Sequence, residues 1–178
     1  HTLRLGVSLR SYPGGLWVGC WMPAERRRLV APFIFFVHLR PTKFAPGTGV
    51  DVRPHPHIAL ATVTYLFAGS LEHRDSLGSV RQIHPGDVNW MSAGSGIAHS
   101  ERTPQAARVS GQYVHAIQSW VALPGGHEDA EPTFVHHPAA ALTTRVTCGI
   151  APTDIPGAWV GGPAPGPPVL TRATPRPP

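Results

Sequence analysis

The chain has 178 residues, of which 42% are hydrophobic and 14% charged, so its composition excludes an intrinsically disordered protein and allows one sizeable domain. Its 21 prolines and 19 glycines favour a β-rich fold with many turns. A net charge of +5 would suit a nucleic-acid ligand, but the basic residues are scattered and their one tight run, residues 25–29, is interpreted as a solvated turn, so we expect no direct nucleic-acid contact.

The cysteines and the hydropathy pattern indicate the cellular compartment of the protein. Cys20 and Cys148 are the only cysteines, and neither stands in a C-x-x-C pair. This pattern argues against a zinc knuckle or a disulfide framework and predicts a reducing, cytoplasmic location. No N-terminal stretch has the pattern of a signal peptide, and no apolar run approaches the roughly 20 residues of a membrane span. We therefore expect no membrane partner.

Strand-like segments follow one another along most of the chain. Runs rich in β-branched and aromatic residues, bounded by turn residues, predict strands at residues 15–22, 33–39, 53–57, 59–69, 70–75, 79–84, 88–92, 95–101 and 112–123. The runs on either side of residues 76–78 predict a hairpin, residues 40–49 a Gly/Pro loop, and no segment a convincing amphipathic helix. This pattern is typical of an all-β sandwich or a small antiparallel barrel.

The character of the sequence changes after Pro124. Residues 134–150 are compatible with one or two short strands, whereas residues 151–178 carry nine prolines and few charges. A segment with so little to bury is predicted to be disordered or polyproline-like.

Two histidines flank a single proline in the stretch VRPHPHIAL, residues 52–60. Side chains at positions i and i+2 of a strand leave from the same face, so His55 and His57 would point at one place. Pro56 fixes its own φ and has no N–H, which predicts a strand edge, a bulge or a strand end. Two neighbouring imidazoles on a stiff backbone indicate a metal site that needs further ligands.

A second pair has the same spacing. His99 and Glu101 follow Gly94 and Gly96, which permit a tight bend and a close approach of backbone. If the two strands face each other in a barrel, the two pairs together offer three imidazoles and one carboxylate. Such a set of nitrogen and oxygen ligands suits Fe, Mn, Co, Ni, Cu or Zn.

Other histidines and several apolar residues have more ordinary interpretations. His38 and His115 lie in predicted strands and are candidates for side chains that support the ligands. The remaining histidines are interpreted as surface or core residues: His73, His84, His127, His136 and His137. Four further residues are candidates for an apolar wall beside the metal, with ordinary barrel core as the alternative: Phe35, Phe36, Trp90 and Met91.

The spacing around the first pair resembles a known motif. Gly49, five residues, His55-Pro-His57 and then Gly69 are similar to the first motif of the cupin barrel, G-x5-H-x-H-x4-E-x6-G. Thr62 stands where that motif has its glutamate.

The second pair departs from the cupin pattern in an informative way. Residues 86–94 resemble the second cupin motif, but the histidine arrives two residues late, at His99, and Glu101 then replaces the missing carboxylate. This substitution pattern resembles the pirin family, and the resemblance covers about residues 23–141. The pirin-like runs are residues 25–36, 50–80, 83–103, 117–124 and 131–140.

The resemblance implies a fold and a division of the chain. Pirins are bicupins, with two consecutive β-barrels, so we expect an all-β, cupin-type antiparallel barrel or jelly roll with a short, incomplete C-terminal extension. The implied units are a poorly matched segment (1–22), a pirin-like N-terminal cupin barrel (23–124), the start of an incomplete second cupin half (125–150) and the Pro-rich tail (151–178).

The family pattern is not met everywhere. Val37 stands where pirins have an Asp before His38, so a carboxylate that could support the site is missing. After about residue 141 the sequence no longer follows the family, and we expect the second barrel to be truncated, degenerate or replaced. Apolar surface exposed in this way predicts self-association.

The resemblance also implies chemistry. One divalent metal ion, iron first and otherwise Ni, Cu, Mn, Co or Zn, would be bound by His55, His57, His99 and Glu101, with Glu101 also the catalytic base. The implied activity is that of a quercetin 2,3-dioxygenase, which opens a flavonol with O₂. The alternatives are a non-enzymatic, metal-dependent regulator of transcription or metabolism that binds a protein partner, and an inactive fragment.

Overall fold

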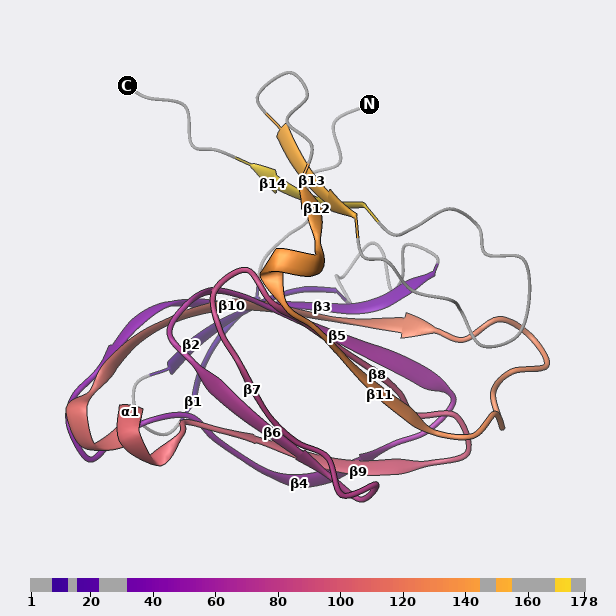
Figure 1. The fold of residues 1–178 in the computed structure, drawn as a ribbon, viewed down its shortest axis with the longest axis horizontal. Coiled ribbons are helices and arrows are strands. Elements are labelled where there is room, and N and C mark those ends of the chain that lie inside the picture. The colour runs from indigo at the N-terminus through magenta and orange to yellow at the C-terminus, as the bar shows by residue number, and fades with distance from the viewer. Residues whose placement is uncertain (1–7, 13–15, 23–31, 145–149, 155–168, 174–178) are drawn as a thin grey trace.

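Two antiparallel sheets face each other and enclose the core of the protein (Figure 1). The structure, a computed structural model, describes residues 8–12, 16–22, 32–144, 150–154 and 169–173. Within these residues the fold is almost entirely β, as the sequence predicted, and it forms a cupin-like sandwich. No helix in the described part of the chain is long and apolar enough to cross a membrane.

The larger sheet has seven strands in the order β1-β2-β3-β10-β5-β8-β11 among the described residues. Its strands are β1 (Ser8–Tyr12), β2 (Leu16–Met22), β3 (Phe33–Phe44), β5 (Leu60–Ala68), β8 (Val88–Ser92), β10 (Gln112–Ala122) and β11 (Thr133–His137). Strand β10 lies near the middle of the sheet, between β3 and β5. Its inward-facing side chains therefore lie deep in the sandwich.

In the part of the chain that the structure describes, the smaller sheet has four strands in the order β4-β9-β6-β7. They are β4 (Asp51–His57), β9 (Ile97–Arg102), β6 (Leu71–Asp75) and β7 (Val80–Ile83). The predicted hairpin is confirmed, because β6 pairs with β7 from Leu71 opposite Ile83 to Arg74 opposite Val80.

Strand β4 is an edge strand with a bulge, and it ends one residue after Pro56, as expected for a strand that contains this proline. It is the last strand of its sheet among the described residues, its register with β9 shifts between Val52 and His55, and it ends at His57. A proline is tolerated at such positions because no ladder hydrogen bond needs its missing N–H.

Short elements complete the fold. The helix α1 (Gln105–Ser110) and the 3-10 turn η1 (Ala139–Ala141) connect strands, and β12 (Thr143–Thr144), β13 (Ile150–Asp154) and β14 (Val169–Ala173) form a small third sheet. No helix was predicted at α1: it has six residues, no side-chain cap and no buried side chain, so it carries no amphipathic pattern.

Two segments have more strand structure than the sequence predicted. Strand β3 continues to Phe44 through part of the predicted loop, and Pro41 fits because the register between β3 and β10 shifts there. The tail expected to be disordered contributes two paired strands, β13 and β14, while residues 155–168 and 174–178 lie outside the described residues. Strand β11, which lies in the segment assigned to the start of a second half, pairs with β8 in the larger sheet.

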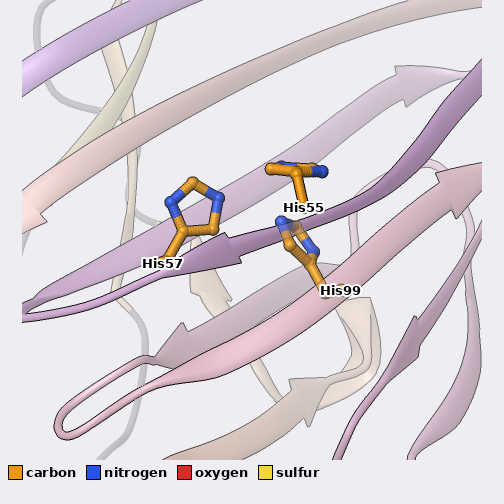
Figure 2. A group of neighbouring side chains, drawn as sticks. All are labelled: His55, His57 and His99. Carbon is orange, nitrogen blue, oxygen red and sulfur yellow. The ribbon is translucent and has the colours of Figure 1, made fainter.

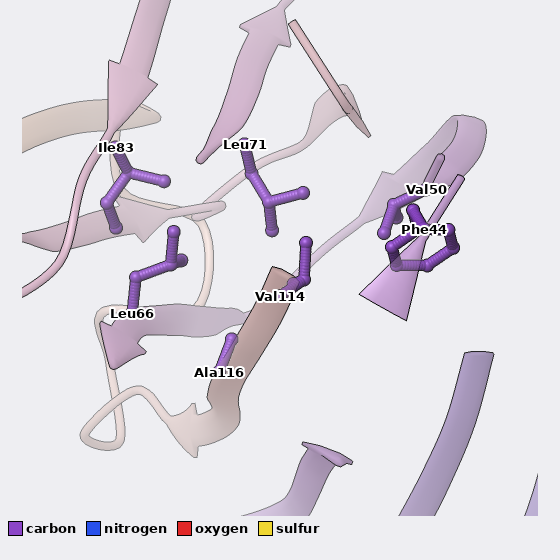
Figure 3. Packing of buried hydrophobic residues seen from close by; sticks show 7 residues of the cluster. All are labelled: Phe44, Val50, Leu66, Leu71, Ile83, Val114 and Ala116. Atoms are coloured by element: carbon purple, nitrogen blue, oxygen red, sulfur yellow. The ribbon is translucent and has the colours of Figure 1, made fainter. Parts of the chain in front are cut away.

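The main apolar cluster lies at the end of the sandwich where β5 ends and β10 begins, and Figure 3 shows its side chains from close by. Its buried members are Phe44, Val50, Leu66, Leu71, Ile83, Val114 and Ala116. They come from both sheets and from the loop between β3 and β4, so their burial holds the two sheets together.

Candidate metal centre

Three imidazoles from two adjacent strands lie close together (Figure 2). His55 and His57 leave the same face of β4, and His55 lies directly opposite His99 of β9 in the register of the smaller sheet. Opposite residues of an antiparallel pair project to the same side. The H-x-H pair and the first residue of the H-x-E pair therefore meet as the spacing predicted.

The distances leave room for one shared ion. The ring centroids of His55 and His57 are 4.9 Å apart, those of His55 and His99 4.5 Å, and those of His57 and His99 5.0 Å. One nitrogen of each ring lies within 4.8 Å of the corresponding nitrogens of the other two. Ligand atoms about 2.0–2.1 Å from a single ion lie at most about 4.2 Å apart, so small rotations of these side chains would bring the three nitrogens around one ion.

The turn before His99 explains how the strand reaches this position. Gly94 has a φ of +48°, and a Cβ atom there would overlap the carbonyl oxygen of Ala130. The Gly94 carbonyl accepts a hydrogen bond of 2.8 Å from the Ala59 N–H, just after β4. Both the tight bend and the close backbone approach expected of this glycine are thus present.

Burial keeps two of the imidazoles neutral. Desolvation, with a smaller contribution from His55, lowers the pKa of His57 from 6.5 to about 4. Desolvation, followed by the nearby His55, His73 and His57, lowers the pKa of His99 from 6.5 to about 3. A neutral imidazole offers the lone pair that a metal needs.

Two buried polar atoms of the described residues have no hydrogen-bond partner, His99 Nε2 and Trp120 Nε1. The Trp120 ring lies beside the cluster, with its centroid 4.9 Å from that of His57. Burying a polar atom without a partner is costly. A metal ion ligated by His99 Nε2 would remove that cost, so the residues fit a divalent cation.

Glu101 lies two residues after His99 on β9, but its carboxylate does not join the three-histidine group. The side-chain amide of Gln118 donates to both carboxylate oxygens, at 2.9 and 3.0 Å, and the Thr64 hydroxyl donates to Oε1 at 3.1 Å. The carboxylate is thus held on the larger sheet, beside the imidazoles rather than among them.

The four candidates for an apolar wall divide between the two faces of the larger sheet. Phe35 stacks on Trp120 with ring centroids 4.3 Å apart and so lies next to the cluster. Met91 is buried with Ala93 and Ile97. Trp90 instead packs against a separate apolar cluster around Val88 and Val121. Phe36 follows Phe35 on β3, so alternation along the strand turns it to the other face of the sheet.

His38 and His115 do not support the ligands. Their Nε2 atoms are 2.8 Å apart, and His115 stacks on Phe67. His38 follows Val37, which lies opposite Gln118 in the sheet, so alternation along β3 turns His38 to the other face.

Four residues near the site were not singled out as site residues from the sequence: Gln118, Trp120, His73 and Asp75. His73 was interpreted as an ordinary surface or core histidine, but it contacts His99, with 3.4 Å between their Nδ1 atoms. The signal was present, since His73 and Asp75 are again two apart in a predicted strand.

Comparisons with known proteins agree on one family. The family model described as Pirin matches residues 18–121 of the chain. A pirin-like protein of Caulobacter vibrioides is 49% identical over 130 residues, which cover 72% of this chain and 45% of that protein. A Pseudomonas aeruginosa protein named "Putative quercetin 2,3-dioxygenase" is 43% identical over 166 residues, which cover 93% of this chain and 51% of that protein.

A solved structure supports the same fold. The crystal structure of a quercetin 2,3-dioxygenase from Acinetobacter baumannii superposes with a TM-score of 0.76 at 34% sequence identity, covering 89% of this chain and 51% of that one. The chain therefore spans about half the length of the relatives that it matches.

Proposed function

Because the chain belongs to the pirin family, we propose that it binds one divalent metal ion through His55, His57, His99 and Glu101 and acts as a quercetin 2,3-dioxygenase-type oxidoreductase on a flavonol. The observation that carries the proposal is the buried, unpartnered Nε2 atom of His99, in a group of three imidazoles that each offer one nitrogen within 4.8 Å of the others. The names of relatives with 43% and 34% identity favour this substrate class.

Iron is the first candidate for the ion, and Ni, Cu, Mn, Co and Zn suit the same ligands. Histidine nitrogens with one carboxylate do not discriminate strongly among these ions, so metal supply decides which is bound. When bound, the ion would supply Lewis acidity, which lowers the pKa of a ligated flavonol hydroxyl.

Glu101 has two parts in this proposal. Its carboxylate would complete the ligand set, and one of its oxygens would accept the proton of the flavonol 3-hydroxyl. Gln118 and Thr64 hold the carboxylate beside the imidazoles through three hydrogen bonds of 2.9–3.1 Å. Holding the base in place before substrate arrives reduces the reorganisation that the reaction needs.

The aromatic pair Phe35 and Trp120 would bind the flat substrate. Their rings stack 4.3 Å apart next to His57, and stacked aromatic faces suit a flavonol ring system. The unpartnered Trp120 Nε1–H would donate a hydrogen bond to a substrate oxygen.

The test is metal content by mass spectrometry, beside a His55→Ala/His57→Ala double variant. We expect about one ion per chain, lost in the variant, and quercetin-dependent O₂ uptake by the loaded chain that the variant lacks. Bound metal without O₂ uptake would favour the non-enzymatic regulator. No bound metal after reconstitution would contradict the proposed site.

A further inference from the structure

A buried chain of hydrogen bonds leads away from the proposed metal centre. His73, on β6, is 3% exposed, and its Nδ1 lies 3.4 Å from Nδ1 of His99. Its other ring nitrogen, Nε2, lies 2.8 Å from Oδ2 of Asp75, whose side chain is completely buried. Asp75, His73 and His99 thus form one line, with β6 and β9 side by side in the smaller sheet.

The far end of this line is fixed by backbone. Oδ1 of Asp75 accepts hydrogen bonds of 3.0 Å from the N–H groups of both Leu77 and Ser79, in the turn between β6 and β7. Burial raises the pKa of the Asp75 carboxyl, but the hydrogen bonds from His73 and Ser79 lower it on balance. The carboxylate form can only accept hydrogen bonds.

The middle of the line is held by an aromatic stack. Phe134, on β11 of the larger sheet, lies against His73 with ring centroids 4.1 Å apart and an interplanar angle of 10°. This contact fixes the plane of the His73 ring, so its two nitrogens face Asp75 and His99 at the same time.

The positions of the protons follow from the carboxylate. Oδ2 of Asp75 can only accept a hydrogen bond, so Nε2 of His73 carries a proton and donates the hydrogen bond between them. In a neutral imidazole the other nitrogen is then an acceptor, so Nδ1 of His73 accepts from Nδ1–H of His99. The proton of neutral His99 is thereby placed on Nδ1, and the lone pair on Nε2, the buried atom that has no partner.

We propose that Asp75 and His73 are positioning residues that fix the tautomer of His99 and so present its Nε2 lone pair to the metal shared with His55 and His57. The inference rests on the proposed function in that Nε2 is taken to be a ligand. Partners of this kind behind a ligating imidazole fix its tautomer and orientation in many metal sites. Here the carboxylate acts through an intervening histidine.

Asp75→Asn keeps the shape of the side chain but should reverse the direction in which each hydrogen bond from residue 75 to His99 is donated. The amide oxygen stays with the Leu77 and Ser79 N–H groups, which only an acceptor can satisfy. The amide NH₂ then faces Nε2 of His73, so this nitrogen must accept a hydrogen bond. The proton of the His73 ring is therefore on Nδ1. Nδ1 of His99 must in turn accept, and the proton moves to His99 Nε2, where it opposes metal binding.

Two measurements on the 178-residue chain test the inference. Long-range ¹H–¹⁵N NMR of the metal-free chain at about pH 8, where imidazoles are neutral, reports the tautomer directly: we expect Nδ1–H for His99 in the parent chain and Nε2–H in Asp75→Asn. Competition with a chelator for Ni²⁺ reports affinity, which we expect to be about 10- to 100-fold weaker in the variant. Glu72→Gln is the matched control, since this half-buried carboxylate on the same strand pairs with Arg74 instead.

A second pair of variants guards against a folding defect in Asp75→Asn. In His73→Gln the amide can still donate to Asp75 and accept from His99, so Ni²⁺ affinity stays within a few-fold of the parent chain. In His73→Leu the acceptor is gone, and the 10- to 100-fold loss returns.

The outcomes separate this inference from the proposed function. An Nε2–H tautomer of His99 in the parent chain, an unchanged tautomer in Asp75→Asn, or equal Ni²⁺ affinities for His73→Gln and His73→Leu would each overturn the inference. A parent chain with the Nδ1–H tautomer that binds no metal would instead support the tautomer assignment and contradict the proposed metal site.

Discussion

The apolar end of the sandwich and its histidine end share strands β5, β6 and β10 but hold opposite kinds of side chain. The apolar end is the cluster around Leu66 and Val114, and the histidine end contains the three imidazoles with Gln118 and Glu101. Strand β10 contributes to both, with Val114 and Ala116 at one end and Gln118 and Trp120 at the other. All four side chains point to the inside of the sandwich. Their position along β10 therefore decides whether they pack in the apolar cluster or lie beside the imidazoles.

The apolar end stabilises the fold around the histidine end. The histidine end buries polar atoms that have no partner, which destabilises the fold. The apolar end contributes burial that offsets this cost and holds the two sheets at a fixed separation.

Truncation at the apolar end has the largest expected effect. Leu66 is completely buried, so Leu66→Ala should lower the free energy of unfolding by about 2–5 kcal/mol, measured by urea denaturation. Leu77→Ala, the same change at a residue 47% exposed, should have an effect near zero. Equal losses in the two variants would show that the cluster does not hold the sheets together.

Acid should destabilise the histidine end selectively. The pKa values of His57 and His99 are lowered from 6.5 to about 4 and about 3, so below about pH 6.5 the unfolded chain binds protons that the folded chain does not. Stability is fully present above that pH and falls as the pH decreases, by roughly 1.4 kcal/mol per pH unit for each imidazole.

The measurement is urea denaturation of the metal-free chain between about pH 6.5 and pH 4.5. His57→Gln and His99→Gln should each show a shallower dependence on pH than the parent chain. A parent chain whose stability does not change over this range would contradict the burial of neutral imidazoles.

Making the histidine end of β10 apolar should cost less. Gln118→Leu leaves the Glu101 carboxylate without its main donor, and we expect a loss of about 1–3 kcal/mol in urea denaturation. The double variant Gln118→Leu/Glu101→Leu removes both partners and should recover most of this loss. If it does not recover, the destabilisation has another origin, such as poor packing of the leucine.

The smallest expected effect concerns the contact between Phe134 and His73. Phe134→Leu keeps an apolar side chain but loses the stacking, which should cost about 0.5–1.5 kcal/mol beyond the area lost. Val135→Ala, at the exposed neighbouring residue, is the control. Similar small losses in both variants would mean that the stack contributes nothing specific.

Much of the fold and of the site could be predicted because their signals are local. Alternating strands and turn residues lie close together in the sequence, and the spacing of two between His55 and His57 directly places both imidazoles on one face. The same spacing of two between His99 and Glu101 then linked a second strand to this pair. All three predictions agree with the structure.

The remaining features depend on contacts between distant segments. The larger sheet brings Gln118 and Thr64 together from strands 54 residues apart, and nothing in either segment names its neighbour. Asp75 and His73 had a readable spacing, but the role of His73 depends on β6 lying beside β9. The continuation of β3 through Pro41 depends on a bulge that forms only with β10.

The prolines of strand β4 have a consequence beyond holding the imidazoles in place. Pro54 and Pro56 stand on the strand at the end of the smaller sheet, and neither can donate a backbone hydrogen bond. A strand at the end of a sheet otherwise invites pairing with a strand of another chain, which leads to aggregation. The two prolines therefore make β4 a poor template for such pairing, and they protect the strand that carries two of the three imidazoles without covering it.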